Sequence, residues 1–352
     1  MTLIYFVGRT LYFVVGLLVM SRLFPLLLLL LLLLVGARQP SSSVNERQAF
    51  SPGDNRRPRS LRVMEWNVEN LFDTVHDEGF QDQEFLPTSE RRWTSHRCWQ
   101  KMTELAKVIA AVGEEGGIPD IIGLCEVEND SVLTMFTRRS VLRHLGYHYV
   151  ITHSEDQRGV DVALLYQPVR FGLIDSRSIR VPSKEHGFRP TRDFLHVRGR
   201  VLTSTGVDTL NVIVVHLPSR AGGSEGDRNR ALAARTLWAV ADSIVGSGGR
   251  LLVMGDFNAS SSDRIFRRTP LLCTDDPHDA GTYCFQGFWE WLDHIYVSTE
   301  IKTRGKARTV RFPWLLEENK TYGCEMPWRT YRGPAYHGGI SDHLPVLLDL
   351  LW

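Results

Sequence analysis

Residues 251–258 read LLVMGDFN, an apolar run that ends in Gly255-Asp256-Phe257-Asn258. Four consecutive apolar residues bounded by a glycine are typical of a short buried strand. Asp256 and Asn258 then stand where that strand ends, at positions that a sheet fixes in space while the following loop leaves them accessible. Taken alone, the same pattern describes an Asx turn. The stretch gains meaning only if other strands end in the same way.

Other apolar runs in the chain are also followed or flanked by polar residues. Predicted strands cover residues 61–66, 118–125, 160–166, 210–215 and 291–297. The polar motifs beside the strands are WNVEN at 66–70, GLCEVEN at 123–129, RGVD at 158–161, HLPSR at 216–220 and GISDH at 339–343. So many motifs at predicted strand ends favour an active site that several strands share.

Helical periodicity separates some of these strands. Apolar residues recur at three- and four-residue spacing over 98–112 and 227–245, which predicts amphipathic helices. A composition of 43% hydrophobic and 23% charged residues is that of a globular chain. No linker rich in Pro, Gly or Ser divides the chain after about residue 60, so we expect one domain over 61–352. Many strands with few helices predict an α/β layered sandwich.

The motifs and their order resemble the endonuclease/exonuclease/phosphatase family over residues 61–352. This family includes pancreatic-type deoxyribonucleases, abasic-site endonucleases, neutral sphingomyelinases and inositol polyphosphate phosphatases. The resemblance implies a four-layer αββα sandwich, with two mixed sheets packed face to face and helices outside. It also implies a hydrolase of ester bonds, a Mg²⁺-dependent phosphodiesterase or endonuclease-like enzyme that cuts by in-line attack of water.

The resemblance further implies a divalent cation at Asn67, Glu126 and Asp342. Glu126 supplies a hard carboxylate oxygen, which suits Mg²⁺ or Mn²⁺, and Ca²⁺ is a third choice. Asn67 completes the site as a neutral oxygen ligand or supports it through a hydrogen bond. Asp342 is expected beside the ion. The ion would neutralise charge on the phosphate oxygens.

Two motifs are expected to act on the attacking water and the phosphate. Asp256 would orient or deprotonate the water, and Asn258 would donate a hydrogen bond to a non-bridging phosphate oxygen. His343 needs an orienting carboxylate, and the family resemblance gives that role to Asp293. His294 is expected to face the opposite side of its strand and to pack there, because alternate strand residues face opposite ways.

A second histidine-carboxylate pair follows from the likeness to pancreatic-type deoxyribonucleases. It sets Asp161 beside His216, which would protonate the leaving oxygen or bind phosphate. Arg158, Ser219 and Arg220 flank these positions and are expected to contact phosphate, an arginine through a bidentate fork. A solvated loop position is the equal alternative for Arg220.

The charge balance bears on the substrate. The chain has 41 Lys and Arg against 40 Asp and Glu, and Arg9 and Arg22 are the charged residues of positions 1–37, which leaves 39 against 40 in the remainder. Proteins that grip long nucleic acid usually carry a cationic excess. The balance therefore argues against a dedicated DNA-binding role and leaves a local basic patch open.

Three functions stay open. The first is a phosphodiesterase that acts on DNA or RNA. The alternative is a phosphatase or phospholipase-C-like enzyme on small phosphate esters or lipid head groups, and the last is a catalytically silent binding module. Aromatic residues near the site would stack bases or meet lipid, although burial is the commoner fate of tryptophans; the residues concerned are Trp289, Trp291, Trp314 and Trp328. We expect a monomer.

The first 37 residues predict export. The apolar stretch 24–35 has the length of a signal h-region and is followed by the small residues Val35-Gly36-Ala37, so we expect cleavage after Ala37 and a periplasmic, outer-surface or secreted protein. The start is Met1 or Met20. Together with the stretch 3–20, the same segment would alternatively form an uncleaved membrane anchor. Residues 38–60 are expected to be a polar linker.

The five cysteines match no zinc-ligand spacing. In an oxidising compartment Cys273 and Cys284 could close a short loop, and the odd total would leave at least one free thiol. Cys125 is expected in the core.

Overall fold

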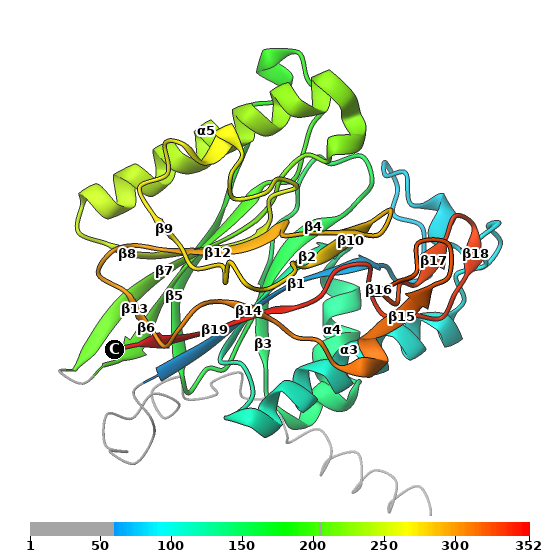
Figure 1. Cartoon of the computed structure of the whole chain (residues 1–352), viewed down its shortest axis with the longest axis horizontal. Helices are drawn as coiled ribbons and strands as arrows, with labels where there is room; N and C mark the ends of the chain where they lie inside the picture. The colour runs from blue at the N-terminus through cyan, green and yellow to red at the C-terminus, as the bar shows by residue number, and fades with distance from the viewer. Residues whose placement is uncertain (1–59, 204–205) are drawn as a thin grey trace, which may run out of the picture. The chain divides into compact units, whose positions relative to one another are not determined.

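The computed structural model describes residues 60–203 and 206–352, whose path is shown in Figure 1. The predicted signal segment or anchor and the predicted linker up to residue 59 lie outside the described residues. Within the described residues, no helix is long and apolar enough to cross a membrane.

A seven-stranded sheet forms the first half of the described fold. Its strand order is β13-β19-β1-β2-β4-β3, and β14 also pairs with β19. The pair β1–β2 is parallel and the other pairs are antiparallel, so the sheet is mixed. The strands are β1 (Ser60–Leu71), β2 (Ile121–Val127), β3 (His148–Ile151), β4 (Asp161–Tyr166), β13 (Lys302–Thr303), β14 (Arg308–Thr309) and β19 (Val346–Leu351).

A six-stranded sheet forms the second half, in the order β5-β6-β7-β8-β12-β9. Here the pair β7–β8 is parallel and the other pairs are antiparallel. The strands are β5 (Phe171–Ile179), β6 (Phe194–Leu202), β7 (Val207–His216), β8 (Arg250–Asp256), β9 (Leu272–Cys273) and β12 (Asp293–Val297). Each of the two mixed sheets thus carries one parallel pair.

Helices cover the outer face of each sheet, as Figure 1 shows for α5 (Gly223–Gly246) on one side and α3 (Ser95–Val112) with α4 (Asp130–Arg138) on the other. Apolar side chains of α3 and α4 pack on the first sheet, and those of α5 pack on the second. A third cluster of buried residues lies between the two sheets. The arrangement is the predicted four-layer αββα sandwich, so the fold expected from the sequence is confirmed.

The same apolar faces explain why these segments become helices. Met102, Leu105 and Ile109 repeat at three- and four-residue spacing along α3 and are fully buried. Removing such a side chain from water stabilises the fold by about 1.5–3 kcal/mol. Thr94 caps the start of α3 by accepting a hydrogen bond from the backbone N–H of Arg97. Both predicted helices and all six predicted strands overlap elements of the structure.

Three short antiparallel hairpins connect the larger elements. They are β10 (Tyr283–Phe285) with β11 (Phe288–Glu290), β15 (Leu316–Asn319) with β16 (Cys324–Pro327), and β17 (Tyr331–Arg332) with β18 (Ala335–Tyr336). The β10–β11 turn is formed by Gln286 and Gly287, both with positive φ, as a tight two-residue hairpin loop requires. Tyr283 makes an isolated bridge to His343, which places this hairpin beside the strand ends that carry the predicted site.

Candidate active site

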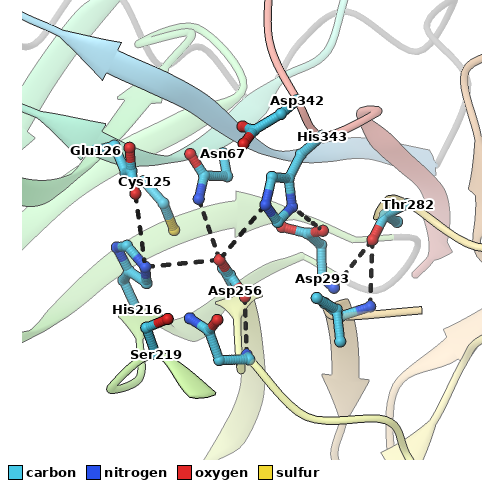
Figure 2. A network of polar contacts seen from close by, with 12 residues as sticks. Asn67, Cys125, Glu126, His216, Ser219, Asp256, Thr282, Asp293, Asp342 and His343 are labelled. Atoms are coloured by element: carbon cyan, nitrogen blue, oxygen red, sulfur yellow. Dashed lines mark hydrogen bonds and ion pairs between the residues drawn. The ribbon is translucent and has the colours of Figure 1, made fainter. Parts of the chain in front are cut away.

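Strand register brings the predicted site residues together. In the first sheet, Asn67 of β1 pairs with the residue that precedes Glu126 in β2. In the second sheet, His216 of β7 pairs with Asp256 of β8, and Asp256 pairs with Asp293 of β12. The two sheets pack face to face, so these strand ends meet at one end of the sandwich (Figure 2).

Backbone irregularities direct two of these strand ends. The register between β1 and β2 shifts after Asn67, and Glu126 adopts a φ of +64°. A bulge re-aims the side chain of a strand, and a left-handed conformation costs a residue other than glycine roughly 1–3 kcal/mol. The backbone N–H of Asn70 offsets part of this cost by donating to Glu126 Oε2 at 3.0 Å. Gly255 has a φ of +147°, and a Cβ there would lie 1.8 Å from the Val215 carbonyl oxygen, so β8 requires a glycine at this point.

One cleft of about 660 Å³ collects the predicted site residues, except Asp161 and Asp293. Those that line it are Asn67, Glu126, Arg158, His216, Ser219, Arg220, Asp256, Asn258, Asp342 and His343. Figure 2 shows the buried part of this group, with the side chains of both sheets turned toward one another. The sequence therefore predicted a set that the fold assembles in one place.

Asp256 lies at the centre of the contacts (Figure 2). Its Oδ2 accepts a hydrogen bond from Asn67 Nδ2 at 3.0 Å, and its Oδ1 accepts one from the backbone N–H of Asn258 at 2.8 Å. The second bond is the Asx turn that the sequence suggested, and it coexists with a place in the cleft. Burial raises the pKa of Asp256 to about 6, and the Asp293 carboxylate adds to the rise. Asp256 therefore exchanges a proton close to neutral pH.

His343 and Asp293 form the expected pair. His343 Nδ1 lies 2.7 Å from Asp293 Oδ2, and its Nε2 lies 3.9 Å from Asp256 Oδ2. Burial opposes a charge on His343, but the Asp293 carboxylate outweighs it and raises the imidazole pKa well above its ordinary value. His343 is thus an imidazolium that donates from Nδ1 to Asp293 and presents Nε2–H toward Asp256. The other oxygen of Asp293, Oδ1, is buried without a hydrogen-bond partner among the described residues.

His216 differs from His343 in charge. Its Nε2 lies 3.5 Å from Asp256 Oδ2 and 4.0 Å from Glu126 Oε1. Burial lowers the pKa of His216 well below its ordinary value, and the nearby Arg192 and Arg158 add to this effect. The ring is therefore neutral near pH 7, and these contacts are not ion pairs.

The predicted pairing of His216 with Asp161 is corrected by the structure. Asp161 Oδ1 accepts hydrogen bonds from Thr152 Oγ1 at 2.7 Å and from the backbone N–H of Ser154 at 3.1 Å. Asp161 lines a different, smaller cavity together with Ser154 and Glu128. Local hydroxyl and amide donors therefore occupy the carboxylate that the family resemblance gave to the histidine.

Glu126 and Arg158 form the charged wall of the cleft. Arg158 Nη2 lies 3.3 Å from Glu126 Oε2 and donates to Asn70 Oδ1 at 2.7 Å. Burial opposes the charge of Glu126, but Arg158, Arg192 and His343 together lower its pKa, so the carboxylate is ionised.

The predicted cation ligands fit a hard cation by their chemistry. Glu126 is an ionised carboxylate, and Asp342 is a second acid on the cleft wall, where Arg329 Nη2 donates to its Oδ2 at 2.9 Å. Asn67 Oδ1 accepts one hydrogen bond, from the backbone N–H of Glu69, which leaves it a lone pair for another partner. Two carboxylates and an amide oxygen are the donors that Mg²⁺ and Ca²⁺ take.

A second group of potential ligands lies deeper in the same site. One atom each of Asp256, Asp293 and His343 falls within 4.8 Å of the others. His343 is held there as an imidazolium, and a protonated ring nitrogen offers no lone pair. The set around Glu126 is therefore the better cation site.

The two predicted phosphate contacts on the rim have other partners. Arg220 makes a bidentate ion pair with Glu290 of β11, at 3.0 and 2.6 Å, and so ties the β10–β11 hairpin to the loop after β7. Ser219 Oγ accepts a hydrogen bond from the backbone N–H of Ala221 and caps the turn. Both residues still line the cleft.

Sequence reasoning missed the aromatic rim of the cleft. Tyr283, Phe285 and Phe288 of the β10–β11 hairpin line it, and Phe285 and Phe288 are 55% and 76% exposed. The Tyr283 ring lies 4.8 Å from the His343 ring. The clue was the Gln286-Gly287 pair between aromatic residues, a pattern typical of a hairpin turn.

The four tryptophans singled out in the sequence do not line the cleft. Trp289 packs against the core, with the Arg311 guanidinium 4.0 Å from its ring centre, and Trp291 packs between the sheets. Trp314 stacks on Phe312 at 5.2 Å.

Two buried charged groups near the site were also missed. Glu65, two residues before Asn67 on the same face of β1, is fully buried, and burial together with Asp293 and Asp256 raises its pKa well above the ordinary value. Arg192 donates to Asp156 Oδ2 at 3.1 Å and to the Leu217 carbonyl at 2.9 Å. A charged residue inside an apolar run was the available signal for Glu65.

All five cysteines lie in the described part of the chain, and all are free. The suggested Cys273–Cys284 bridge is therefore wrong, because Cys273 pairs with β12 while Cys284 lies in the β10–β11 hairpin. Cys125 is fully buried, as expected.

An αββα sandwich with acids, amides and imidazoles gathered at its strand ends defines a phosphoester-hydrolase architecture. A sequence model of the Endonuclease/Exonuclease/phosphatase family matches residues 62–351. The chain belongs to this family, whose members hydrolyse phosphoester bonds. Nocturnin from Xenopus laevis is 24% identical over 317 residues, which covers 85% of this chain and 74% of that protein.

Solved structures share the fold at low sequence identity. A humanized TDP2 of D. rerio aligns with a TM-score of 0.55 and 13% identity, covering 84% of this chain and 100% of that one. A mannosyl-6-phosphatase from Bacteroides thetaiotaomicron gives 0.53 and 16%, covering 83% and 100%. A family protein from the same organism gives 0.53 and 15%, covering 84% and 96%.

Proposed function

We propose that the chain is an exported, divalent-cation-dependent phosphodiesterase, with nucleic acid as its first substrate class. The observation that supports the proposal is the combination of groups in one cleft: ionised Glu126, Asp256 with a pKa of about 6, cationic His343 and neutral His216. Phosphoester hydrolysis needs a proton acceptor for water and positive charge for the phosphate oxygens. This cleft offers both within a few ångströms.

Asp256 is the group that activates water in this proposal. Its ionised form predominates above pH 6, and Asn67 and the Asn258 backbone hold its two oxygens in place. A base with a pKa near the working pH accepts a proton efficiently in the transition state. Nearby His216 Nε2, on a neutral ring, is a hydrogen-bond partner for the same water or for the phosphate.

His343 supplies positive charge and a proton donor. Asp293 fixes its orientation, and its Nε2–H is directed toward the centre of the cleft. Because His216 is neutral, the cationic His343 is the better proton donor to the leaving oxygen or a phosphate oxygen, a role that the sequence had given to His216. Asn258 Nδ2 donates to the Leu217 carbonyl at 3.0 Å, and its second N–H is available to a phosphate oxygen.

A divalent cation of the Mg²⁺ type would be held by Glu126 and Asp342, with Asn67 as a neutral oxygen partner. When bound there, it would neutralise charge that develops on the phosphate oxygens. Mn²⁺ and Ca²⁺ prefer the same oxygen donors, and the donor set alone does not choose among the three.

The rim of the cleft favours a substrate with a flat ring. Phe285 and Phe288 are exposed aromatic side chains beside the phosphate groups, and stacking on an aromatic residue contributes about 1–3 kcal/mol per base. Small phosphate esters and lipid head groups are the second candidate, because the charge of the chain is balanced. A silent binding module remains the third.

The test is a phosphoester screen of the purified chain with Mg²⁺, Mn²⁺ and Ca²⁺. The proposal predicts release of acid-soluble nucleotides from DNA or RNA, abolished by EDTA. Turnover of bis-p-nitrophenyl phosphate or inositol phosphates without nucleic-acid cleavage would select the second candidate. A folded, cation-loaded protein that hydrolyses nothing would select the binding module.

Export is proposed from the sequence of the first 37 residues, with a mature protein in the periplasm, at the outer surface or in the medium. The mass of the intact protein recovered from its host tests this proposal. A mature N-terminus at Arg38 supports cleavage after Ala37, and retention of residues 1–37 supports the membrane anchor instead.

A further inference from the structure

A second cluster of polar side chains lies on the opposite face of β12 from the active site. Along this strand Asp293 faces the cleft while His294 and Tyr296 face away from it. Strand β9 pairs antiparallel with β12 and sets Cys273 opposite Tyr296. Two residues further along, the same register sets Asp275 opposite His294. Four side chains that could bind or surround an ion therefore share one side of this sheet edge.

The geometry of the cluster is that of a small ligand cage. One atom each of Cys273, Asp275 and His294 lies within 4.8 Å of the others. His294 Nδ1 is 2.7 Å from Asp275 Oδ2, and its Nε2 is 2.8 Å from the Ala259 carbonyl oxygen. A histidine that binds a metal usually donates its other ring N–H to a carbonyl or carboxylate, which fixes the tautomer. Here the Ala259 carbonyl accepts from Nε2–H, so Nδ1 is the nitrogen that faces the cluster.

Two buried oxygens in the cluster lack partners. Asp275 Oδ1 and Tyr296 Oη are buried without a hydrogen-bond partner among the described residues. Native proteins pair nearly all such atoms, so each unpaired one calls for a missing neighbour. Tyr296 is 1% exposed and His294 is fully buried, which leaves the more accessible Cys273 as the side from which an ion would enter.

We propose that Cys273, Asp275 and His294 bind a transition-metal ion of the Zn²⁺ class through Sγ, a carboxylate oxygen and Nδ1. A thiolate, an imidazole and a carboxylate together suit Zn²⁺, whereas the all-oxygen set around Glu126 suits Mg²⁺. The fourth position faces Tyr296 Oη or a water molecule. The two sites lie on opposite faces of β12 and take different kinds of ion.

Without an ion, the cluster is an ion pair. Burial opposes protonation of His294, but the Asp275 carboxylate outweighs it and raises the imidazole pKa to about 10. Metal binding must therefore displace the proton on Nδ1 and the proton of the Cys273 thiol. Two protons leave for each ion bound, which gives the site a measurable signature.

The role that follows is structural. An ion held by β9, the following residue Asp275 and β12 would fix the strand whose next side chain, Asp293, orients His343. Zn²⁺ is expected to raise the unfolding temperature of the chain, since a ligand that binds only the folded state stabilises it. The phosphoesterase reaction does not require the ion.

The test uses Co²⁺ and Zn²⁺ on the purified chain with Mg²⁺ in excess to occupy the oxygen site. Wild-type protein should show a thiolate-to-cobalt charge-transfer band and about one equivalent of tightly bound Zn²⁺, with about two protons released per ion. Cys273→Ser should lose the band and the tightly bound ion. Cys324→Ser, which changes a cysteine outside the cluster, should keep both.

The same measurements can overturn the proposal. A wild-type protein with no thiolate-to-cobalt band, or a Cys273→Ser variant with the wild-type Zn²⁺ content, leaves the cluster as a His294–Asp275 ion pair only. If Cys273→Ser fails to fold, Asp275→Asn takes its place, because the amide keeps the size of the side chain and is a poorer ligand. A Zn²⁺-induced rise in unfolding temperature that survives in Asp275→Asn would equally contradict the site.

Discussion

The floor and the rim of the cleft are built by different means. The floor consists of Asn67, Glu126, His216, Asp256 and His343, which are held by strand register and by hydrogen bonds across two sheets. The rim consists of Tyr283, Phe285 and Phe288 on one hairpin, whose outer attachment is the Arg220–Glu290 ion pair. Ion pairs at the surface contribute only about 0–1 kcal/mol. The floor is therefore rigid, whereas the rim can change at little cost to the fold.

This difference separates two kinds of function. The floor holds the groups that exchange protons and carry charge, so it decides the reaction. The rim offers exposed rings that meet whatever is attached to the phosphate, so it decides which ester binds. Substitutions in the floor should lower kcat, and substitutions in the rim should change KM for some substrates and leave others untouched.

The largest effect is expected in the His343–Asp293 pair. Asp293→Asn should lower kcat by as much as about 10⁴-fold, because an amide can hold the wrong imidazole tautomer, and leave metal affinity nearly unchanged. The double variant with His343→Ala should be little slower than His343→Ala alone, since the two side chains act as one unit. Steady-state kinetics on all three variants measure this coupling. Losses that simply multiply would show that the two residues act separately.

Glu126→Gln should remove cation-dependent turnover, with a loss of about 10³-fold, because a neutral amide of equal size is a poorer ligand for a hard cation. The fold should remain intact, as circular dichroism would show. Wild-type dependence of the rate on Mg²⁺ concentration in this variant would refute the assignment of Glu126.

The pH profile should report the state of Asp256. Its pKa of about 6 means that the ionised base is lost as the pH falls through that value, so kcat/KM should drop about tenfold for each unit below pH 6. Asp293 and His343 face Asp256, and His343 stays cationic across this window because its pKa is raised. Asp256→Asn should abolish the acidic limb together with most of the activity. A profile that stays flat down to pH 5 would exclude Asp256 as the base.

Removing the rings of the rim should affect binding alone. Phe285→Ala with Phe288→Ala should raise KM for a dinucleotide ester about tenfold and leave kcat near the wild-type value. The KM for bis-p-nitrophenyl phosphate serves as the comparison for a smaller ester. Trp314→Ala, an exposed aromatic residue outside the cleft, is the matched control. Equal losses in the control would mean that the effect does not come from the rim.

The smallest effect is expected at Glu65. Burial raises the pKa of this carboxyl well above its ordinary value, so it is protonated in the fold and Glu65→Gln should change kcat less than about threefold. The stability that Glu65 contributes is fully present below its unfolded pKa of about 4.3 and is lost as the pH rises through the raised folded value. Denaturant melts across this range should therefore show a flatter dependence on pH in the variant. An unchanged pH dependence would place the ionised form of Glu65 in the fold.

The floor could be predicted from the sequence because each of its residues ends a strand, and strand ends are readable from apolar runs. His294 shows the same rule on the other face, since strand alternation predicted its burial. Asp161 failed the family assignment because the hydroxyl of Thr152 and the N–H of Ser154, a few residues away, satisfy its carboxylate. That partner choice depends on local hydrogen bonds that no motif reveals.

The rim could not be predicted, because a two-residue turn with exposed rings looks like any surface hairpin. Its place beside His343 depends on the bridge between Tyr283 and His343, a long-range contact that no local pattern announces. The search for aromatic residues also favoured tryptophans, and the structure packs them elsewhere.

The pairing of β1 with β19 has a consequence for the order of synthesis. β1 carries the first floor residue, Asn67, and its neighbour in the sheet is the last described strand, which follows His343 in the chain. A nascent chain that ends before His343 lacks both the imidazolium and the strand that completes the sheet beside β1. Hydrolysis must therefore wait until nearly the whole domain has left the ribosome, so an incomplete chain cannot cut phosphate esters in the compartment where it is made.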